Sequence, residues 1–191
     1  MENGCMVERA SALAGHYSAT RFGQEGDPGV TLCEVPGLVL HQVSAWPDTL
    51  SAVAAEAALA VGLTGAPGPG LAAAGTAGAL LRVEPLKWWI YRGEAPELPA
   101  DTGTTLDLSH ARSHVRVSGP QAATCLNRHL PLDLRDAFCP VGSVASTALH
   151  HVGITLWRSE DGFELFVPRG FALSTWEILI ETAAQFGAEV K

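Results

Sequence analysis

Charged residues are scarce in this chain. Only 17% of its 191 residues are charged and 47% are hydrophobic, whereas charged residues make up about 25% of an ordinary globular domain. A chain with so little charge either buries an unusual share of its residues or exposes apolar surface that another protein covers. A composition rich in alanine and glycine offers a second explanation, because both residues raise the apolar share without creating adhesive surface. Composition therefore indicates a partner protein but does not require one.

Basic clusters, long apolar runs and paired cysteines are also missing. The net charge is −8, and no Lys/Arg cluster is present to neutralise phosphates, which excludes a nucleic-acid binder. No run of about 18 apolar residues could cross a membrane, and the start has no basic region followed by an apolar one, so we expect a cytoplasmic protein. The cysteines stand singly and far apart, which favours reduced thiols over a zinc site or a disulfide framework: Cys5, Cys33, Cys125 and Cys139.

The length of 191 residues suits one compact domain. Residues 1–29 have no hydrophobic period and predict an irregular lead-in. Residues 30–191 are expected to form a single α+β domain, with halves over about 30–94 and 104–189. Each half runs from strand to helix to strand, which predicts two βαβ-like halves and antiparallel sheets with helices packed on one face.

The first half begins with strand formers from Val30 to Trp46 that break at Pro36-Gly37, which predicts a bent strand or two short ones. Asp48 then suits the N-cap of a helix whose apolar positions recur as far as Val61.

The rest of the first half is less regular. Residues 65–78 are rich in glycine and alanine but lack the Lys and Ser/Thr of a phosphate loop, so we expect a flexible connector. Strand formers at 80–92 are interrupted by Pro85, which predicts a bend or an edge position, and residues 95–103 are typical of a linker.

The second half carries clearer signals. Strands are expected at 104–109, 114–118 and 143–157, with a short helix at 121–127. The polar turn Ser159–Gly162 predicts that 163–167 returns as the antiparallel partner of the preceding strand. Ser174 and Glu177 fit a capping box for a helix with apolar positions as far as Phe186, which Gly187 would end.

Two histidine groups are candidates for metal or proton-transfer sites. His110 and His114 are four apart, but in a strand this spacing separates them by about 13 Å, too far to share a metal, and the glutamate of an HExxH helix is absent. His150 and His151 would point to opposite faces of a strand. Histidines bonded within a sheet or at an interface are the favoured interpretation.

No motif for catalysis is present either. The chain has no GxSxG elbow, GxGxxG turn or phosphate loop. Five acidic residues are assigned to solvated loops or turns: Asp133, Asp136, Glu160, Asp161 and Glu164. Four arginines in an acidic chain require carboxylates or a bound anion, and internal salt bridges are the favoured explanation: Arg112, Arg116, Arg128 and Arg135. We therefore predict no catalytic residue, no cofactor-binding residue and no metal ligand.

Four segments nevertheless resemble a known family. LDLSHARSHVRVSGPQA, LNRHLPLDLRD, FCPVGSVASTALHHVGITLWR and DGFELFVPRGFALSTWEIL, between Leu106 and Phe186, are together similar to the gamma subunit of heterotetrameric sarcosine oxidase. The resemblance implies a fold similar to the folate-binding module of the glycine-cleavage T-protein. The KGC-type motif of the folate-dependent relatives is absent, so we assign no folate to this chain.

The resemblance also implies a division of labour among subunits. FAD, FMN, NAD, tetrahydrofolate and zinc would be held by the alpha, beta and delta subunits. The assembled enzyme would oxidise sarcosine to glycine, form hydrogen peroxide and pass the methyl carbon to tetrahydrofolate. This chain would be a non-catalytic gamma subunit that contacts the alpha subunit foremost.

Contacts with those subunits are expected from aromatic and arginine side chains, which dominate protein interfaces. The candidates are Trp88, Trp89, Arg112, Arg116, Arg128, His151 and Trp157. Three alternatives stay open: the corresponding subunit of N-methylglutamate dehydrogenase, a free-standing folate-binding or aminomethyltransferase-like protein, and an interaction module without an oxidase partner.

Overall fold

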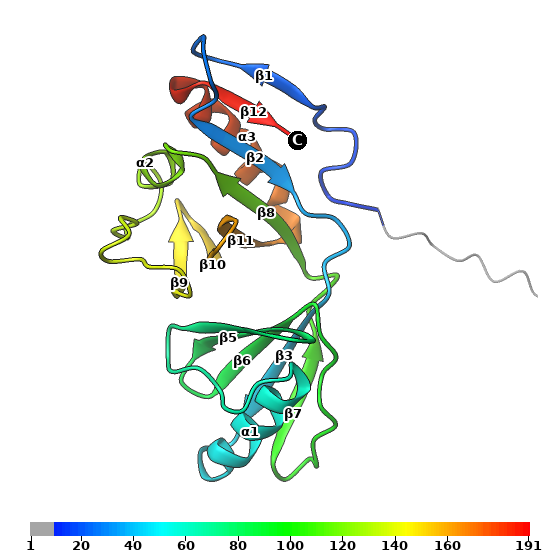
Figure 1. Cartoon of the computed structure of the whole chain (residues 1–191). Helices are drawn as coiled ribbons and strands as arrows, with labels where there is room; N and C mark the ends of the chain where they lie inside the picture. The colour runs from blue at the N-terminus through cyan, green and yellow to red at the C-terminus, as the bar shows by residue number, and fades with distance from the viewer. Residues whose placement is uncertain (1–9) are drawn as a thin grey trace, which may run out of the picture.

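The computed structural model describes residues 10–191, which form two β-sheets stacked one above the other, with helices on their outer sides (Figure 1). The larger sheet contains β1 (Thr20–Phe22), β2 (Val30–Glu34), β8 (Arg112–Ser118), β9 (Val144–Leu149), β10 (Val152–Ser159), β11 (Gly162–Pro168) and β12 (Ala188–Val190). The smaller sheet contains β3 (Leu40–Ala45), β4 (Ala72–Gly75), β5 (Gly78–Glu84), β6 (Lys87–Tyr91) and β7 (Gly103–Asp107). The helices are α1 (Leu50–Ala60), α2 (Ala122–Leu126) and α3 (Ala172–Ala183), and short 3-10 turns span Pro47–Thr49, Arg169–Phe171 and Ala184–Phe186.

The strand orders are β1-β12-β2-β8-β11-β10-β9 and β4-β5-β6-β3-β7. Among the strands of residues 10–191, only β12 and β2 pair in parallel. The predicted α+β class with antiparallel sheets is thus confirmed. The sheets do not follow the expected halves, because β2 joins the elements that come after residue 111 while β7 joins β3–β6.

The core of the larger sheet lies between the sheet and α3. Trp176 and Leu179 on α3 are buried against Val115 and Leu165 of the central strands. The N-terminal segment contributes to this core, because Leu13 is fully buried and β1 pairs with β12. The lead-in expected to be irregular thus includes one short strand and a core residue between irregular turns, whereas residues 1–9, including Cys5, lie outside the described residues.

The smaller sheet buries its outer face under α1. This helix contributes Val53, Ala57 and Ala58, whose small side chains let it approach Trp88 and Ile90 closely. Within residues 10–191, no helix is long and apolar enough to cross a membrane.

The inner faces of the two sheets meet in a third, aromatic core. Trp89 and Tyr91 of β6 contact Phe166 of β11, with ring centroids 5.8 Å apart in both pairs, in edge-to-face geometry. Leu40 and Val144 pack in the same cluster. This contact joins the sheets and brings side chains of β8 and β11 under β6.

Several local predictions are confirmed. The segment from Val30 to Trp46 forms two strands in different sheets, β2 and β3. β10 and β11 form the expected hairpin, with Ser159 opposite Gly162. Gly187 ends the last helical turn with a φ of +64°, a left-handed conformation suited to glycine.

Three expected elements are instead hairpins. The segment 80–92 turns at Pro85 and forms β5 and β6, which lie inside the sheet rather than at its edge. The expected strand 143–157 turns at His150-His151, and the expected connector 65–78 contains β4 and the turn into β5. None of the three turns contains the Asn-Gly or Asp-Gly pair that signals a tight hairpin.

Both predicted N-caps are wrong. Asp48 lies inside the 3-10 turn Pro47–Thr49, and α1 starts after Thr49. Ser174 is the third residue of α3, and its hydroxyl donates to the carbonyl of Phe171 instead of capping the first turn. A 3-10 turn precedes each helix, and α1 begins later than predicted whereas α3 begins earlier.

Candidate functional site

The most concentrated polar group lies on the inner face of the larger sheet, around Glu164 of β11. Its carboxylate accepts hydrogen bonds from the Nε of Arg116 at 2.7 Å and from the hydroxyl of Ser159 at 2.7 Å, both on Oε1. The other oxygen, Oε2, lies 2.6 Å from Nε2 of His114. Arg116 also contacts Asp161 at 3.1 Å. We call these five residues the Glu164 network.

The register of the strands builds this network. β8 pairs with β11 so that Arg116 is directly opposite Glu164 and His114 opposite Phe166. Residues opposite each other in a ladder share a face of the sheet. The His114 ring therefore stacks on Phe166, with centroids 4.8 Å apart, and meets Tyr91 of the smaller sheet edge-on at 5.3 Å.

Burial and charge decide how the network is protonated. Burial acts to raise the pKa of Glu164, but its hydrogen bonds and the cation of Arg116 overcome this and hold it below its usual value. Burial lowers the pKa of His114 despite its bond to Glu164, so the imidazole is neutral at pH 7 and its Nε2–H donates to the carboxylate. Nδ1 of His114 has no hydrogen-bond partner among the described residues.

Glu164 corrects the sequence interpretation. The sequence predicts a solvated turn at this residue, yet Glu164 lies within β11 and is 1% exposed. Its position in the apolar run Phe163–Val167 is a usable signal, because a carboxylate in such a run requires a buried partner. Since both oxygens are occupied, the network fits a fixed structural tie better than an acid or base.

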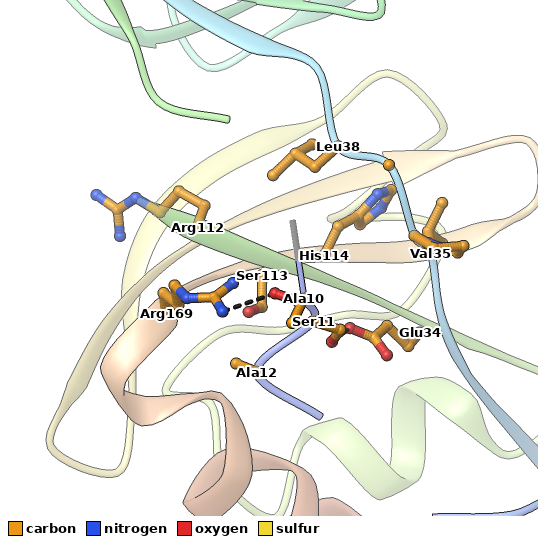
Figure 2. Close-up of a pocket in the computed structure, with 12 residues that line it drawn as sticks. Ala10, Ser11, Ala12, Glu34, Val35, Leu38, Arg112, Ser113, His114 and Arg169 are labelled. Atoms are coloured by element: carbon orange, nitrogen blue, oxygen red, sulfur yellow. Dashed lines mark hydrogen bonds between the residues drawn. The ribbon is translucent and has the colours of Figure 1, made fainter. Parts of the chain in front are cut away.

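A polar cavity of about 170 Å³ adjoins the network, between the N-terminal segment, the crossing from β2 to β3, and β8 (Figure 2). Its charged lining residues are Arg112, Arg169 and Glu34. The Arg169 guanidinium donates to the carbonyl of Ala10 at 2.7 Å. Glu34 accepts hydrogen bonds from the hydroxyls of Ser11 and Tyr17, and burial together with this bond raises the pKa of Tyr17 to about 12.

The structure places the residues predicted to contact partner subunits in different parts of the fold. The guanidinium of Arg112 lies 5.4 Å from the ring of Trp89. Trp157 on β10 is opposite Glu164, so it lies on the inner face with Glu164 between it and Arg116. Trp88 is fully buried under α1 and Trp89 is 4% exposed in the core between the sheets, so the expectation that these two contact a partner is corrected.

Arg128 and His151 are each next in sequence to a histidine of one pair: His129, and His150 on the turn of the β9–β10 hairpin. His129 Nδ1 is 2.7 Å from His150 Nε2, and His129 Nε2 is 2.5 Å from the hydroxyl of Thr182. The ring of His151 is 6.3 Å from that of His150. His150 has a φ of +52°, so the two histidines occupy a turn and not, as expected, opposite faces of a strand.

The expected salt bridging of the arginines is confirmed for only part of the set. Arg116 and Arg135 pair with carboxylates, whereas Arg112 and Arg128 have no ion pair within residues 10–191 and lie over the rings of Trp89 and Phe186. His110 lies in the turn before β8, apart from the buried His114. In the described part of the chain no three His, Cys, Asp or Glu side chains gather as a metal site.

Comparison with known proteins finds similarity over nearly the full length of this chain. No protein-family model matches the chain. The sarcosine oxidase subunit gamma of Corynebacterium sp. (strain U-96) is 29% identical over 202 residues, which cover 98% of both proteins. A chain of the heterotetrameric sarcosine oxidase from Corynebacterium sp. U-96, in complex with pyrrole 2-carboxylate, superposes with a TM-score of 0.77 over 93% of this chain and 96% of that one, at 29% identity.

A second solved structure shows the wider fold. The glycine cleavage system aminomethyltransferase T from Bartonella henselae matches 85% of this chain with a TM-score of 0.55 and 17% identity, and the match covers 47% of that protein. At this identity the likeness concerns the fold alone. The expected similarity to the T-protein fold is confirmed.

Proposed function

We propose that this chain, a homologue of sarcosine oxidase gamma subunits over nearly its full length, is the non-catalytic gamma subunit of a heterotetrameric sarcosine oxidase. The observation that carries the proposal is the 98% coverage of both proteins at 29% identity. A shared domain alone would align over part of one protein only. The resemblance found between Leu106 and Phe186 thus extends to the N-terminal half.

The complex would work in the cytoplasm and oxidise sarcosine to glycine, with hydrogen peroxide as a product and tetrahydrofolate as the methyl-carbon acceptor. FAD, FMN, NAD, tetrahydrofolate and zinc would be held by the alpha, beta and delta subunits. The role of this chain would be to stabilise the alpha subunit. Its closed Glu164 network, in which each carboxylate oxygen already has a partner, supports a structural role.

Two assays test the proposal. Sarcosine-dependent peroxide formation by the alpha, beta and delta subunits should fall or become unstable when this chain is left out, and return when it is added. Titration of the isolated chain with tetrahydrofolate should show no micromolar binding. Binding at that level would favour the free-standing folate protein and contradict the scaffold role.

A further inference from the structure

Strand β7 forms an open edge of the smaller sheet. It ends the order β4-β5-β6-β3-β7, and among the described strands it pairs with β3 alone. Figure 1 shows it at the margin of this sheet, and all its residues except Gly103 are exposed. The preceding connection, 93–102, packs Leu98 against the core under α1, and within residues 10–191 it forms no backbone hydrogen bond with Thr105 or Asp107. The edge is therefore available to another strand.

The other sheet edges in residues 10–191 are better protected. At β4 and β9 the two sheets meet, because the N–H of Val144 donates to the carbonyl of Gly70 and the N–H of Ala72 to that of Gly142, both at 2.7 Å. β1 has only three residues, and a short edge offers little to a partner. β7 has five residues, a register without a bulge, and no lysine or proline, so it lacks the usual protection against strand pairing.

The ladder between β3 and β7 shows which backbone groups of β7 face outward. The N–H of Leu108 donates to the carbonyl of Leu40 at 2.8 Å. Hydrogen-bonded pairs alternate along an antiparallel ladder. Leu106 therefore also bonds to β3, whereas Thr105 and Asp107 turn their N–H and C=O groups away from it. An added strand would form hydrogen bonds with these two residues.

An apolar side chain lies beside this edge. Leu106 is opposite Gln42, and Gln42 is opposite Trp89, so Leu106 shares the inner face of the smaller sheet. Unlike Trp89, which the larger sheet covers, Leu106 is 55% exposed. Side chains on neighbouring strands of one face pack against each other. A strand added at β7 would therefore cover Leu106.

The edge also carries negative charge without a counterion. Residues 93–111 contain four carboxylates and no lysine or arginine: Glu94, Glu97, Asp101 and Asp107. In the part of the chain that the structure describes, none of the four forms an ion pair. A second copy of this chain would bring the same carboxylates and a net charge of −8 to the contact, which disfavours self-pairing. The edge suits a strand that carries lysine or arginine.

We propose that β7 pairs with an extended strand of a partner subunit of the oxidase, and that this strand carries at least one lysine or arginine near the acidic edge. The proposal rests on the proposed function, and it adds the place and the chemistry of one subunit contact. Backbone hydrogen bonds to Thr105 and Asp107 provide affinity, as in other cases where an extended segment adds a strand to a sheet. The opposite charges select the partner.

Hydrogen exchange of the unaltered chain tests the contact directly. Mass spectrometry of peptides that cover 103–107 compares the isolated chain with the purified complex. The amides of Thr105 and Asp107 should exchange at least about tenfold more slowly in the complex, because they gain hydrogen bonds. The amides of Leu106 and Leu108, which already bond to β3, should change less.

Two variants test the backbone and the charge separately, each titrated into the alpha, beta and delta subunits. Thr105→Pro removes an outward N–H, leaves the bonds to β3, and should weaken association at least about tenfold. Asp107→Asn keeps the acceptor for the N–H of Ser109, and it should weaken association about two- to fivefold and reduce its salt dependence. The control Glu160→Gln, at an exposed acid in another turn, should associate as the unaltered chain does.

Unchanged exchange at 103–107 in a complex that forms would overturn the proposal, and so would unaltered affinity of both variants. Should Thr105→Pro fail to fold, Asp107→Asn and the exchange of the unaltered chain still decide. Protection of 103–107 in the isolated chain that rises with its concentration would assign the edge to a second copy and would also overturn the proposal. If the unaltered chain does not associate at all, the proposed function itself fails, which separates the two results.

Discussion

Removal of the Glu164 carboxylate should reduce the stability of the protein more than any other single change in the Glu164 network. In Glu164→Gln the side chain keeps its shape but loses its charge. The variant leaves Arg116 with only its contact to Asp161 and replaces the acceptor shared by His114 and Ser159 with an amide. Breaking a buried ion pair by removing one partner costs about 3–5 kcal/mol.

The lower end of that range applies here, because the Arg116 side chain is 27% exposed and keeps some hydration. A loss of about 3 kcal/mol corresponds to a melting temperature lower by about 6–12 °C in a domain of this size. The control is Glu160→Gln, an exposed acid in the neighbouring turn, which should change stability by less than about 0.5 kcal/mol.

The assay is thermal and urea unfolding of the full chain, followed by circular dichroism. The double variant Arg116→Met with Glu164→Gln, together with Arg116→Met alone, closes a mutant cycle and should recover part of the loss, because it no longer leaves a partly buried cation without its closest carboxylate. Melting temperatures of Glu164→Gln and Glu160→Gln within about 2 °C of each other would refute the assignment of a buried, charged network.

Three further results are expected. Stability should fall as the pH is lowered from 7 to 5, because burial holds the pKa of His114 below its unfolded value near 6.5 and protons therefore bind the unfolded chain preferentially. Urea titrations at each pH would measure the free energy of unfolding, and a value that does not change with pH would contradict this. Leu13→Ala should cost about 2–5 kcal/mol in the same assay because Leu13 is fully buried, whereas Leu59→Ala, at a residue 66% exposed, should cost far less. His150→Gly should relieve the left-handed backbone but lose the contact to His129, so equal stability of His150→Gly and His150→Ala would show that the φ of +52° carries no strain.

The parts of the fold that could be predicted are those coded by local signals. Asp161-Gly162 between two apolar segments predicts the β10–β11 hairpin, and the apolar period from Trp176 onward predicts α3. The sequence predicts only a bend or an edge position at Pro85 and no turn at His150, because neither carries the glycine pair that marks a tight hairpin. The parallel pairing of β12 with β2 joins the two ends of the chain, and no local pattern specifies so distant a contact.

The candidate site could not be predicted for the same reason, because its contacts join residues far apart in the sequence. Glu164 lies 48 residues from Arg116 and 50 from His114, so its partners could not be found from spacing, and polar neighbours at Ser159–Gly162 favoured a solvated turn. The pairing of Arg112 with Trp89 likewise depends on how the two sheets stack. The family resemblance depends on the order of sequence segments, which requires no knowledge of contacts.

The mass of the complex formed on co-expression with the genes for the alpha, beta and delta subunits tests the central claim most directly. Native mass spectrometry should show an assembly that contains this 20.0 kDa chain together with the other three subunits, and its loss on gentle dissociation should leave a smaller, less stable remainder. A complete, active oxidase that never contains this chain, with the chain recovered alone, would contradict the account.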